Sequence, residues 1–202
     1  PGLDREWKKV HLEELFTPVR RKNNINQTLV LTASGEHGLV DQTLYFNRNV
    51  SGRDLSGYFL LNKGEFAYNR SSMNGYPFGA IKRLDEYDSG VLSTLYICFV
   101  PSSSECCSDF YLHLFEAGIL NHELRGIVQV GARAHGLLNV SVKDFFKIKV
   151  PCPPVEEQKQ IARTFNNVDR EINLLKSKLF ALREQKKSLM QQLLTGKVRL
   201  QV

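Results

Sequence analysis

The sharpest pattern in the chain is a row of apolar residues near its carboxyl end, spaced alternately by four and three positions. Such a spacing is the heptad repeat of a coiled-coil helix, and at 1.5 Å per residue the row is about 50 Å long. Lys186 takes the one charged position in the repeat, either at an end of the interface or as a device that sets its register. The row consists of Ile161, Phe165, Val168, Ile172, Leu175, Leu179, Leu182, Leu189 and Leu193.

The sequence around this row marks where the helix begins and ends. Prolines in the stretch 151–154 predict an extended connector, and Glu156 and Glu157 suit the positive end of a helix dipole. Gly196 is the residue type expected just past a helix end. A helix with one narrow apolar stripe needs a second helix along its length, although packing on its own domain stays open as the alternative.

The residues before the helix contain short apolar runs that predict the strands and helices of a mixed α and β domain. Tyr58–Leu61 and Glu65–Tyr68 flank a turn at 62–64, which predicts a β-hairpin. The turn 35–38, with a glycine at each end, predicts a hairpin tip. Other runs predict a strand or short helix at Val10–Phe16, strands at Ala80–Lys82, Val91–Val100 and Ile148–Val150, and helices at Cys107–Phe115 and Ser141–Phe146.

These patterns together predict an α+β chain in two parts. Residues 1–152 form a domain with a mixed sheet, and residues 153–202 form one long coiled-coil helix. The net charge of +6 is divided unequally, because residues 1–155 carry a net +1 and residues 156–202 a net +5. The domain is therefore nearly neutral, and a nucleic-acid surface on it requires local clusters of cations.

The chain lacks the marks of a membrane or secreted protein. No apolar run has the length of a membrane span, and no signal-peptide pattern opens the sequence. The four cysteines show neither disulfide-scaffold nor zinc spacing, which predicts free thiols. We therefore expect a cytoplasmic protein without a metal of its own.

No motif for catalysis stands out. The chain has no Gly-rich phosphate-binding motif, and its one Pro-Pro pair, in 152–155, lacks the neighbours of an amino-methyltransferase motif. The run Glu157-Gln158-Lys159 has the spacing of a metal-dependent nuclease, but it opens a helix where glutamate suits the dipole. We expect no catalytic residue, with the nuclease as the less favoured alternative.

Clusters of cationic and amide side chains are the candidates for nucleic-acid contact. Arginine and lysine neutralise phosphates, while arginine and asparagine can also pair with guanine and adenine edges. The opposing interpretation is that these segments are ordinary solvated loops. The candidate DNA-binding residues are Arg20, Arg21, Lys22, Asn23, Asn24, Asn69, Arg70, Ser71, Ser72, Asn74, Tyr76, Lys82, Arg83, Arg125 and Arg133.

Three segments near the carboxyl end resemble the specificity subunits of type I restriction-modification systems. Residues 141–151 look like the segment that leads out of a recognition domain in that family. Residues 153–162 are similar to its P-x-x-E-Q-x-x-I-A helix opening, and residues 189–199 to its helix ending. The resemblance is looser upstream, around Trp7 and 126–136, because recognition domains differ with the bases they read.

The resemblance implies a function in DNA recognition. A typical subunit of that family has two recognition domains and two helices that pair antiparallel, and this chain has one of each. It is therefore half of a longer protein or a half-subunit that pairs with a second copy. The resemblance also implies double-stranded DNA, methyltransferase subunits and restriction subunits as partners. S-adenosylmethionine, ATP and Mg²⁺ would belong to those partner subunits.

One further interpretation competes with DNA recognition. The coiled coil could oligomerise a protein-binding domain, which would make the chain an adaptor. Specific duplex binding with a steep salt dependence separates the two, because it is expected only of a DNA reader.

Overall fold

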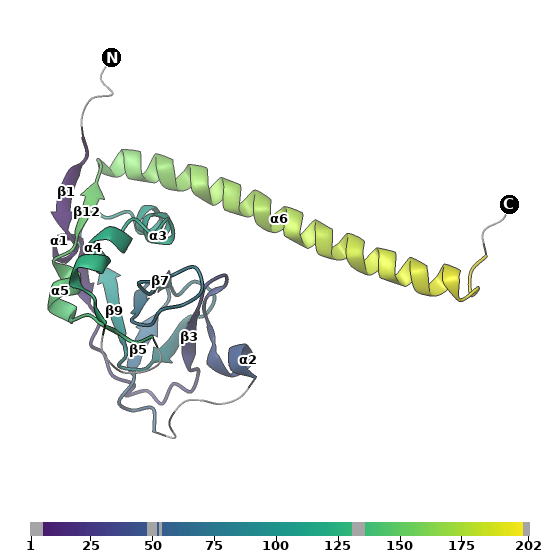
Figure 1. The fold of residues 1–202 in the computed structure, drawn as a ribbon, viewed down its shortest axis with the longest axis horizontal. Helices are drawn as coiled ribbons and strands as arrows, with labels where there is room; N and C mark the ends of the chain where they lie inside the picture. The colour runs from purple at the N-terminus through teal and green to yellow at the C-terminus, as the bar shows by residue number, and fades with distance from the viewer. Residues whose placement is uncertain (1–5, 48–51, 53, 131–135, 200–202) are drawn as a thin grey trace, which may run out of the picture. The chain divides into compact units, whose positions relative to one another are not determined.

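The computed structural model describes residues 6–47, 52, 54–130 and 136–199 (Figure 1). It confirms the predicted fold class, a mixed α+β domain and one long carboxyl-terminal helix. The chain divides into two units, residues 1–159 and 160–202. We call residues 6–159 the head.

The strands are β1 Lys8–His11, β2 Phe16–Pro18, β3 Leu31–Ser34, β4 Gly38–Asp41, β5 Phe59–Asn62, β6 Phe66–Asn69, β7 Ala80–Arg83, β8 Ser89–Leu92, β9 Tyr96–Pro101, β10 Gln129–Val130, β11 Leu138–Asn139 and β12 Lys149–Cys152. The helices are α1 Leu12–Leu15, α2 Gln42–Phe46, α3 Ser108–Glu116, α4 Asn121–Ile127, α5 Val142–Phe146 and α6 Val155–Leu194.

A four-stranded antiparallel sheet in the order β2-β9-β6-β7 forms the centre of the head. Its strands are rich in β-branched and aromatic residues, and consecutive residues of β6, β7 and β9 are buried, so both faces of the sheet are covered. Gly79 enters β7 at φ 84°, a left-handed conformation that glycine adopts without strain. An added Cβ at Gly79 would also collide with the carbonyl of Asn69 on β6.

The predicted hairpin between Tyr58–Leu61 and Glu65–Tyr68 is wrong in its pairing. The turn itself forms, because the Glu65 N–H donates to the Asn62 carbonyl at 3.1 Å and Gly64 adopts φ 85°. The strands on either side then enter different sheets, β5 pairing with β8 while β6 lies between β7 and β9. Both edges of β6 are therefore occupied, and β5 has no place beside it.

The apolar run Val91–Val100 is two strands instead of one. It is broken between β8 and β9, where the Tyr96 N–H donates to the Ser93 carbonyl at 3.1 Å. The hairpin tip predicted at 35–38 is confirmed, since β3 and β4 pair antiparallel across it and Gly38 has φ 75°. The segment Val10–Phe16 contains both of the predicted alternatives, the end of a strand followed by a one-turn helix.

The predicted helices at Cys107–Phe115 and Ser141–Phe146 correspond to α3 and α5. The Ser141 hydroxyl caps α5 by accepting from the Asp144 N–H at 3.0 Å. Strand β12 contains the predicted strand end and pairs antiparallel with β1. The short helices α2 and α4 were not predicted, because neither has enough residues to display a helical period.

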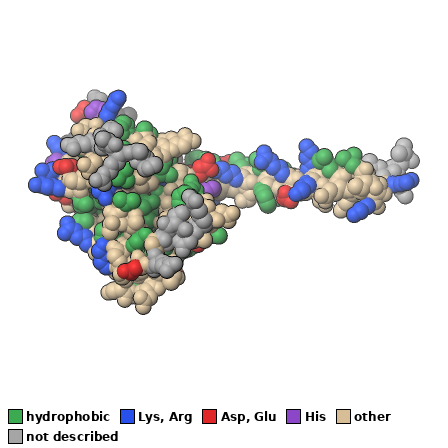
Figure 2. Space-filling view, turned by 60° about the horizontal axis from the view of Figure 1, so that its bottom comes forward, with side chains coloured by type: hydrophobic (Ala, Val, Ile, Leu, Met, Phe, Trp, Pro, Cys, Tyr) green, Lys and Arg blue, Asp and Glu red, His purple; other side chains and the backbone are tan. Residues whose placement is uncertain are grey.

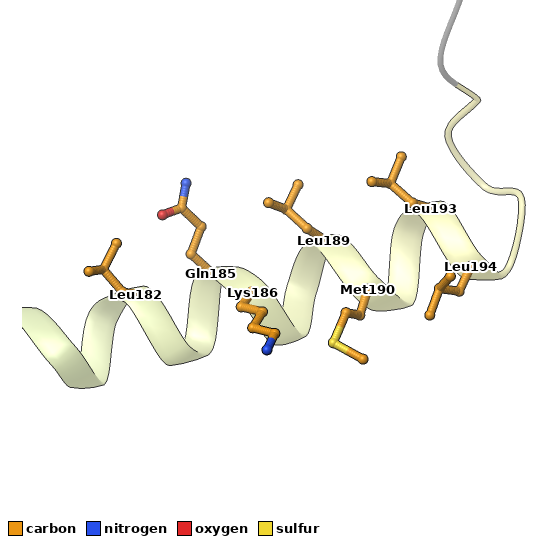
Figure 3. A pocket seen from close by; sticks show the side chains of 7 residues that line it. All are labelled: Leu182, Gln185, Lys186, Leu189, Met190, Leu193 and Leu194. Atoms are coloured by element: carbon orange, nitrogen blue, oxygen red, sulfur yellow. The ribbon is translucent and has the colours of Figure 1, made fainter.

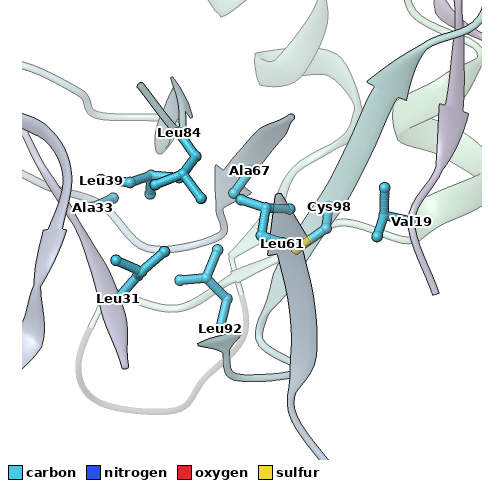
Figure 4. Close-up of a cluster of buried hydrophobic side chains, with 9 residues drawn as sticks. All are labelled: Val19, Leu31, Ala33, Leu39, Leu61, Ala67, Leu84, Leu92 and Cys98. Atoms are coloured by element: carbon cyan, nitrogen blue, oxygen red, sulfur yellow. The ribbon is translucent and has the colours of Figure 1, made fainter. Parts of the chain in front are cut away.

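Two of the apolar clusters in the head pack other elements against the central sheet. The first joins the β3–β4 hairpin to the central sheet (Figure 4). Its buried members are Val19, Leu31, Ala33, Leu39, Leu61, Ala67, Leu84, Leu92 and Cys98. The second is aromatic, with Phe66 stacked on Phe99 at 5.4 Å between ring centroids and Tyr68 stacked on Phe145 at 4.9 Å. Stacked and edge-on ring pairs have a preferred geometry, so this cluster orients α3 and α5 on the sheet.

Helix α6 has a buried amide in its first turn and a glycine just past its last residue. Gln158 is fully buried in the head, where its side chain accepts from the Cys107 N–H at 2.9 Å and donates to the Glu105 and Pro153 carbonyls, each at 2.8 Å. At the other end Gly196, at φ 70°, donates its N–H to the Leu193 carbonyl at 3.2 Å. This confirms the predicted helix end. No helix in the described ranges combines the length and apolarity needed to cross a membrane.

Candidate nucleic-acid interface

The basic segment, residues Arg20–Asn24, follows β2 and is largely committed to the fold. Arg21 donates to the buried carboxylate of Glu65 at 2.5 Å, which also accepts from the Asn62 N–H at 2.8 Å. Asn23 is buried and closes a turn, accepting from the Gln27 N–H at 2.9 Å and donating to the Gln27 carbonyl at 2.8 Å. Arg21 and Asn23 thus both stabilise the loop, but only Asn23 is buried, whereas the Arg21 side chain remains 44% exposed.

The remaining members of the basic segment, Arg20, Lys22 and Asn24, are also exposed. Arg20 and Asn24 lie at the surface, and Lys22 holds its amine 4.1 Å from the Phe59 ring centre while donating to the Gly57 carbonyl at 2.6 Å. Arg20 and Lys22 line a hollow of about 360 Å³, together with Phe59 and Tyr96. This hollow is the cationic part of the candidate interface.

The polar loop, residues Asn69–Tyr76, is also divided between structural and exposed side chains. Arg70 donates to three carbonyl oxygens, those of Leu95 at 2.6 Å, Thr94 at 2.9 Å and Val140 at 3.1 Å. The Arg70 guanidinium therefore clamps the β8–β9 turn to the end of β11. Ser72 and Asn74 are exposed, whereas Asn69, Ser71 and Tyr76 are half-buried.

Lys82 and Arg83 do not present their charges to solvent. Lys82 is 3% exposed and its amine pairs with the Glu116 carboxylate at 2.6 Å. Arg83 pairs with Asp85 at 2.7 Å and with Asp109 at 2.6 Å. A phosphate contact by either side chain would break a partly buried ion pair, so the geometry argues against the predicted role for both.

The last two candidate cations lie outside these clusters. Arg125 is exposed on the short helix α4. Arg133 falls outside the described residues.

A groove of about 740 Å³ brings part of the polar loop together with residues that the sequence did not single out. Four segments form its walls: β3 with the hairpin tip, α2, the polar loop, and the β8–β9 turn. Of the lining residues, Glu36 and His37 are the ionisable side chains besides tyrosine, and both lie on the tip. We call it the amide groove. Its lining residues are Thr32, Ala33, Ser34, Gly35, Glu36, His37, Gln42, Tyr45, Phe46, Asn69, Ser71, Met73, Asn74, Ser93, Leu95 and Tyr96.

Apart from Glu36 and His37 on the tip, the polar groups of the amide groove are neutral and directional. Amide and hydroxyl groups of Gln42, Asn69, Ser71 and Asn74 line it beside the exposed rings of α2. Tyr96 lines both the amide groove and the basic hollow, so the two adjoin. Burial raises the pKa of Tyr96, whose hydroxyl oxygen accepts from the Ala33 N–H at 3.1 Å, and the phenol stays neutral.

The sequence missed the α2 side of this groove. Tyr45 and Phe46 meet edge-on with ring centroids 5.0 Å apart, and both remain about half exposed. The one available signal was Asp41, whose carboxylate accepts from the Thr43 N–H at 2.7 Å and caps the helix. Exposed neighbouring aromatic rings next to a groove are typical of binding surfaces.

The second exposed surface is the apolar stripe of α6, the row of heptad residues from Ile161 to Leu193. Its members from Phe165 onward are 37–56% exposed, unlike core residues of the head. Figure 2 shows hydrophobic side chains along this helix with lysine and arginine among them. An uncovered stripe of this length is expected of a helix that pairs with another.

The end of the stripe shows how the charged heptad position is accommodated. In Figure 3, Leu182, Leu189 and Leu193 project to one side with Gln185, whereas Lys186 points with Met190 and Leu194 to the other. All seven side chains line a hollow of about 400 Å³ along the helix. Lys186 therefore keeps its heptad position between Leu182 and Leu189, while its side chain is directed away from the leucine side chains in this view.

The residues with nuclease-like spacing belong to the first turn of α6. Glu157 accepts from the Trp7 indole N–H at 3.3 Å, Gln158 is buried, and Lys159 pairs with Glu156 at 2.7 Å. Within the described ranges, no three or more His, Cys, Asp or Glu side chains are placed to hold a metal ion. The four cysteines are free thiols, and burial raises the pKa of Cys98 and of Cys106 to about 12.

Comparison with known proteins gives a family match along most of the chain. The model of the type I restriction modification DNA specificity domain matches residues 4–183. Two relatives from Methanocaldococcus jannaschii are each 40% identical over 60 residues, covering 30% of this chain and 14% of each relative. They are the type I restriction enzyme MjaVIII specificity subunit and the MjaX specificity subunit.

Solved structures show the same fold. A chain from a type I R-M system, studied for its complex assembly and conformational transition, matches with TM-score 0.60 and 17% identity over 98% of this chain and 51% of that one. The S subunit of such a system from M. genitalium matches with TM-score 0.58 and 14% identity over 95% of this chain and 46% of that one. The chain thus spans about half the length of these relatives.

Proposed function

This chain belongs to the type I restriction modification DNA specificity family, and from that premise we propose that its head reads one part of a split site in double-stranded DNA. The observation that carries the proposal is the amide groove, lined mainly by neutral hydrogen-bonding groups and adjoining a hollow with exposed cations. Neutral directional groups suit base edges, and exposed cations suit the phosphates beside them.

We assign the two parts of the interface different tasks. Asn74 and Gln42 would contact base edges, where an amide can donate to and accept from adenine together. Arg20, exposed in the adjoining hollow, would contact phosphate and fix the position of the head on the duplex. The aromatic rings of α2 would supply apolar contact, as thymine methyl groups require.

We further propose that α6 pairs through its stripe with a second helix, from another copy of the chain or from the other half of a longer subunit. A helix pair about 50 Å long exceeds one turn of DNA, about 34–36 Å, and can hold two readers at a set separation. In this proposal the chain is non-catalytic and cytoplasmic. Methyltransferase and restriction subunits dock on it and supply S-adenosylmethionine, ATP and Mg²⁺ chemistry.

The test is selection of binding sites from random duplex DNA, with the purified chain alone and with the methyltransferase subunits of its host. We expect an enriched sequence, and an affinity that falls steeply as salt rises because bound phosphates release counterions. A chain that enriches no sequence in either condition would rule out the DNA reader and favour an adaptor. Cleavage by the chain alone on addition of Mg²⁺ would contradict the non-catalytic role.

A further inference from the structure

We propose that the buried amine of Lys82 is a positioning residue for base recognition, because it joins two segments that line the amide groove. The inference rests on the proposed function. Lys82 lies on β7, outside the groove lining, and donates to the carbonyl of Gly35 on the hairpin tip at 2.9 Å. The same amine donates to the Tyr76 hydroxyl at the end of the polar loop, also at 2.9 Å.

The third partner of the amine ties this junction to α3. Lys82 donates to one carboxylate oxygen of Glu116 at 2.6 Å, and the Tyr76 hydroxyl donates to the other at 2.7 Å. All three N–H groups of the amine are thereby used, each on a different segment of the head. Burial raises the pKa of Tyr76, so its phenol stays protonated and can make this donation.

Stability alone does not account for this arrangement. Burying an ammonium group has a desolvation cost that its ion pair offsets at best, and an apolar side chain in the same place is often as stable. What a buried amine adds is direction, since three hydrogen bonds fix the relative positions of three groups. The Lys82 amine also lies 4.6 Å from the centre of the Tyr76 ring, which holds that ring beside the tip.

Both tethered segments bear on residues that line the groove. The Met73 and Tyr76 backbones exchange hydrogen bonds of 3.1 and 2.9 Å, which close a tight turn around Asn74. Holding Tyr76 therefore holds the turn that presents the Asn74 amide. Holding Gly35 likewise fixes the tip between β3 and β4, where the groove begins. Recognition groups need placement within about 0.5 Å, which a loop without such a tether does not keep.

Arg83 provides a matched control on the next residue of β7. It is also partly buried in ion pairs, with Asp85 and with Asp109 at the start of α3, but neither partner lines the groove. Lys82→Met and Arg83→Met thus both remove an ion pair that involves α3. They differ in whether a groove segment loses its tether.

The experiment measures the affinity of each variant for the duplex selected by the parent chain and for duplexes with single base changes. We expect Lys82→Met to reduce discrimination between them about tenfold, with little change in binding to unrelated DNA, because the buried amine meets no phosphate. Arg83→Met is expected to lower the melting temperature but to keep the discrimination.

Full discrimination by Lys82→Met, or equal loss in both variants, would overturn the inference. If Lys82→Met does not fold, Tyr76→Phe decides, because it removes only the hydroxyl through which the polar loop meets the Lys82 amine, the Glu116 carboxylate and the Gly35 carbonyl. We then expect Tyr76→Phe to discriminate less between the selected duplex and its single-base variants. Full discrimination by Tyr76→Phe would overturn the inference. A parent chain without any sequence preference would instead end the proposed function, and this inference with it.

Discussion

Single residues of the candidate interface differ in how many hydrogen bonds their side chains already make within the fold. The guanidinium of Arg70 is bound by three carbonyl groups, and the Lys82 amine is bound by a carboxylate, a hydroxyl and a carbonyl. Arg20 and Asn74 are exposed in the linings of the two adjoining hollows. A cation or amide contributes to recognition only when its hydrogen-bonding capacity is not spent inside the fold.

Substitution of Arg20 and Asn74 by alanine therefore has two different expected outcomes. Arg20→Ala should weaken binding to all duplexes alike and reduce the slope of log affinity against log salt by about one, because it removes a phosphate contact. Asn74→Ala should leave that slope unchanged and cost about 1–3 kcal/mol of discrimination at one base position. Titrations of both variants at several salt concentrations check this, and a base-specific loss in Arg20→Ala would reverse the assignment.

At the scale of elements, the sequence predicted what depends on neighbouring residues. The heptad row, the cap at Ser141 and the glycine at 196 are local signals, and α6, α5 and the helix end confirm them. The pairing of β5 is not local, because its partner β8 lies beyond two intervening strands. The turn at 62–65 is compatible with a hairpin and with a crossing between sheets, so only packing decides.

The same limit applies to the candidate site. Asn69, Ser71 and Asn74 were found because short polar side chains after a strand indicate an exposed loop, and they do line the groove. Lys82 was grouped with surface cations because a lysine next to an arginine resembles a surface cluster in sequence, whereas the structure buries it. Its partner Glu116 is 34 residues away, and no local pattern reveals that pair.

The stripe of α6 allows a prediction with a control one residue away. Leu175 lies on the stripe and is 56% exposed, whereas Leu174 lies off it and is 69% exposed. Leu175→Glu should weaken helix pairing on the order of a hundredfold, because a paired stripe would bury the charge without a partner. Leu174→Glu should leave pairing intact. Light scattering of the parent and both variants checks this, and equal effects would mean that the stripe is not the pairing surface.

At the scale of the whole molecule, one head and one helix correspond to about half the length of the solved specificity subunits that share the fold. A half-unit can read a split site only if something sets the distance to a second reader. The uninterrupted helix from Val155 to Leu194 is the element with the length to do so. Its first turn is held in the head by the buried Gln158, whose side chain accepts from the Cys107 N–H.

Length and base preference should therefore be separable. Four residues inserted after Glu184 would lengthen the helix by about 6 Å, close to two base pairs of DNA, and such an insertion is tolerated in coiled coils as a local change of winding. The expected result of site selection is a longer spacer between unchanged half-site bases. The groove residues are all in the head and are not altered by the insertion. New half-site bases at the old spacing would mean that the helix shapes the reading surface itself. The proposal that helix length sets the spacer would then be wrong.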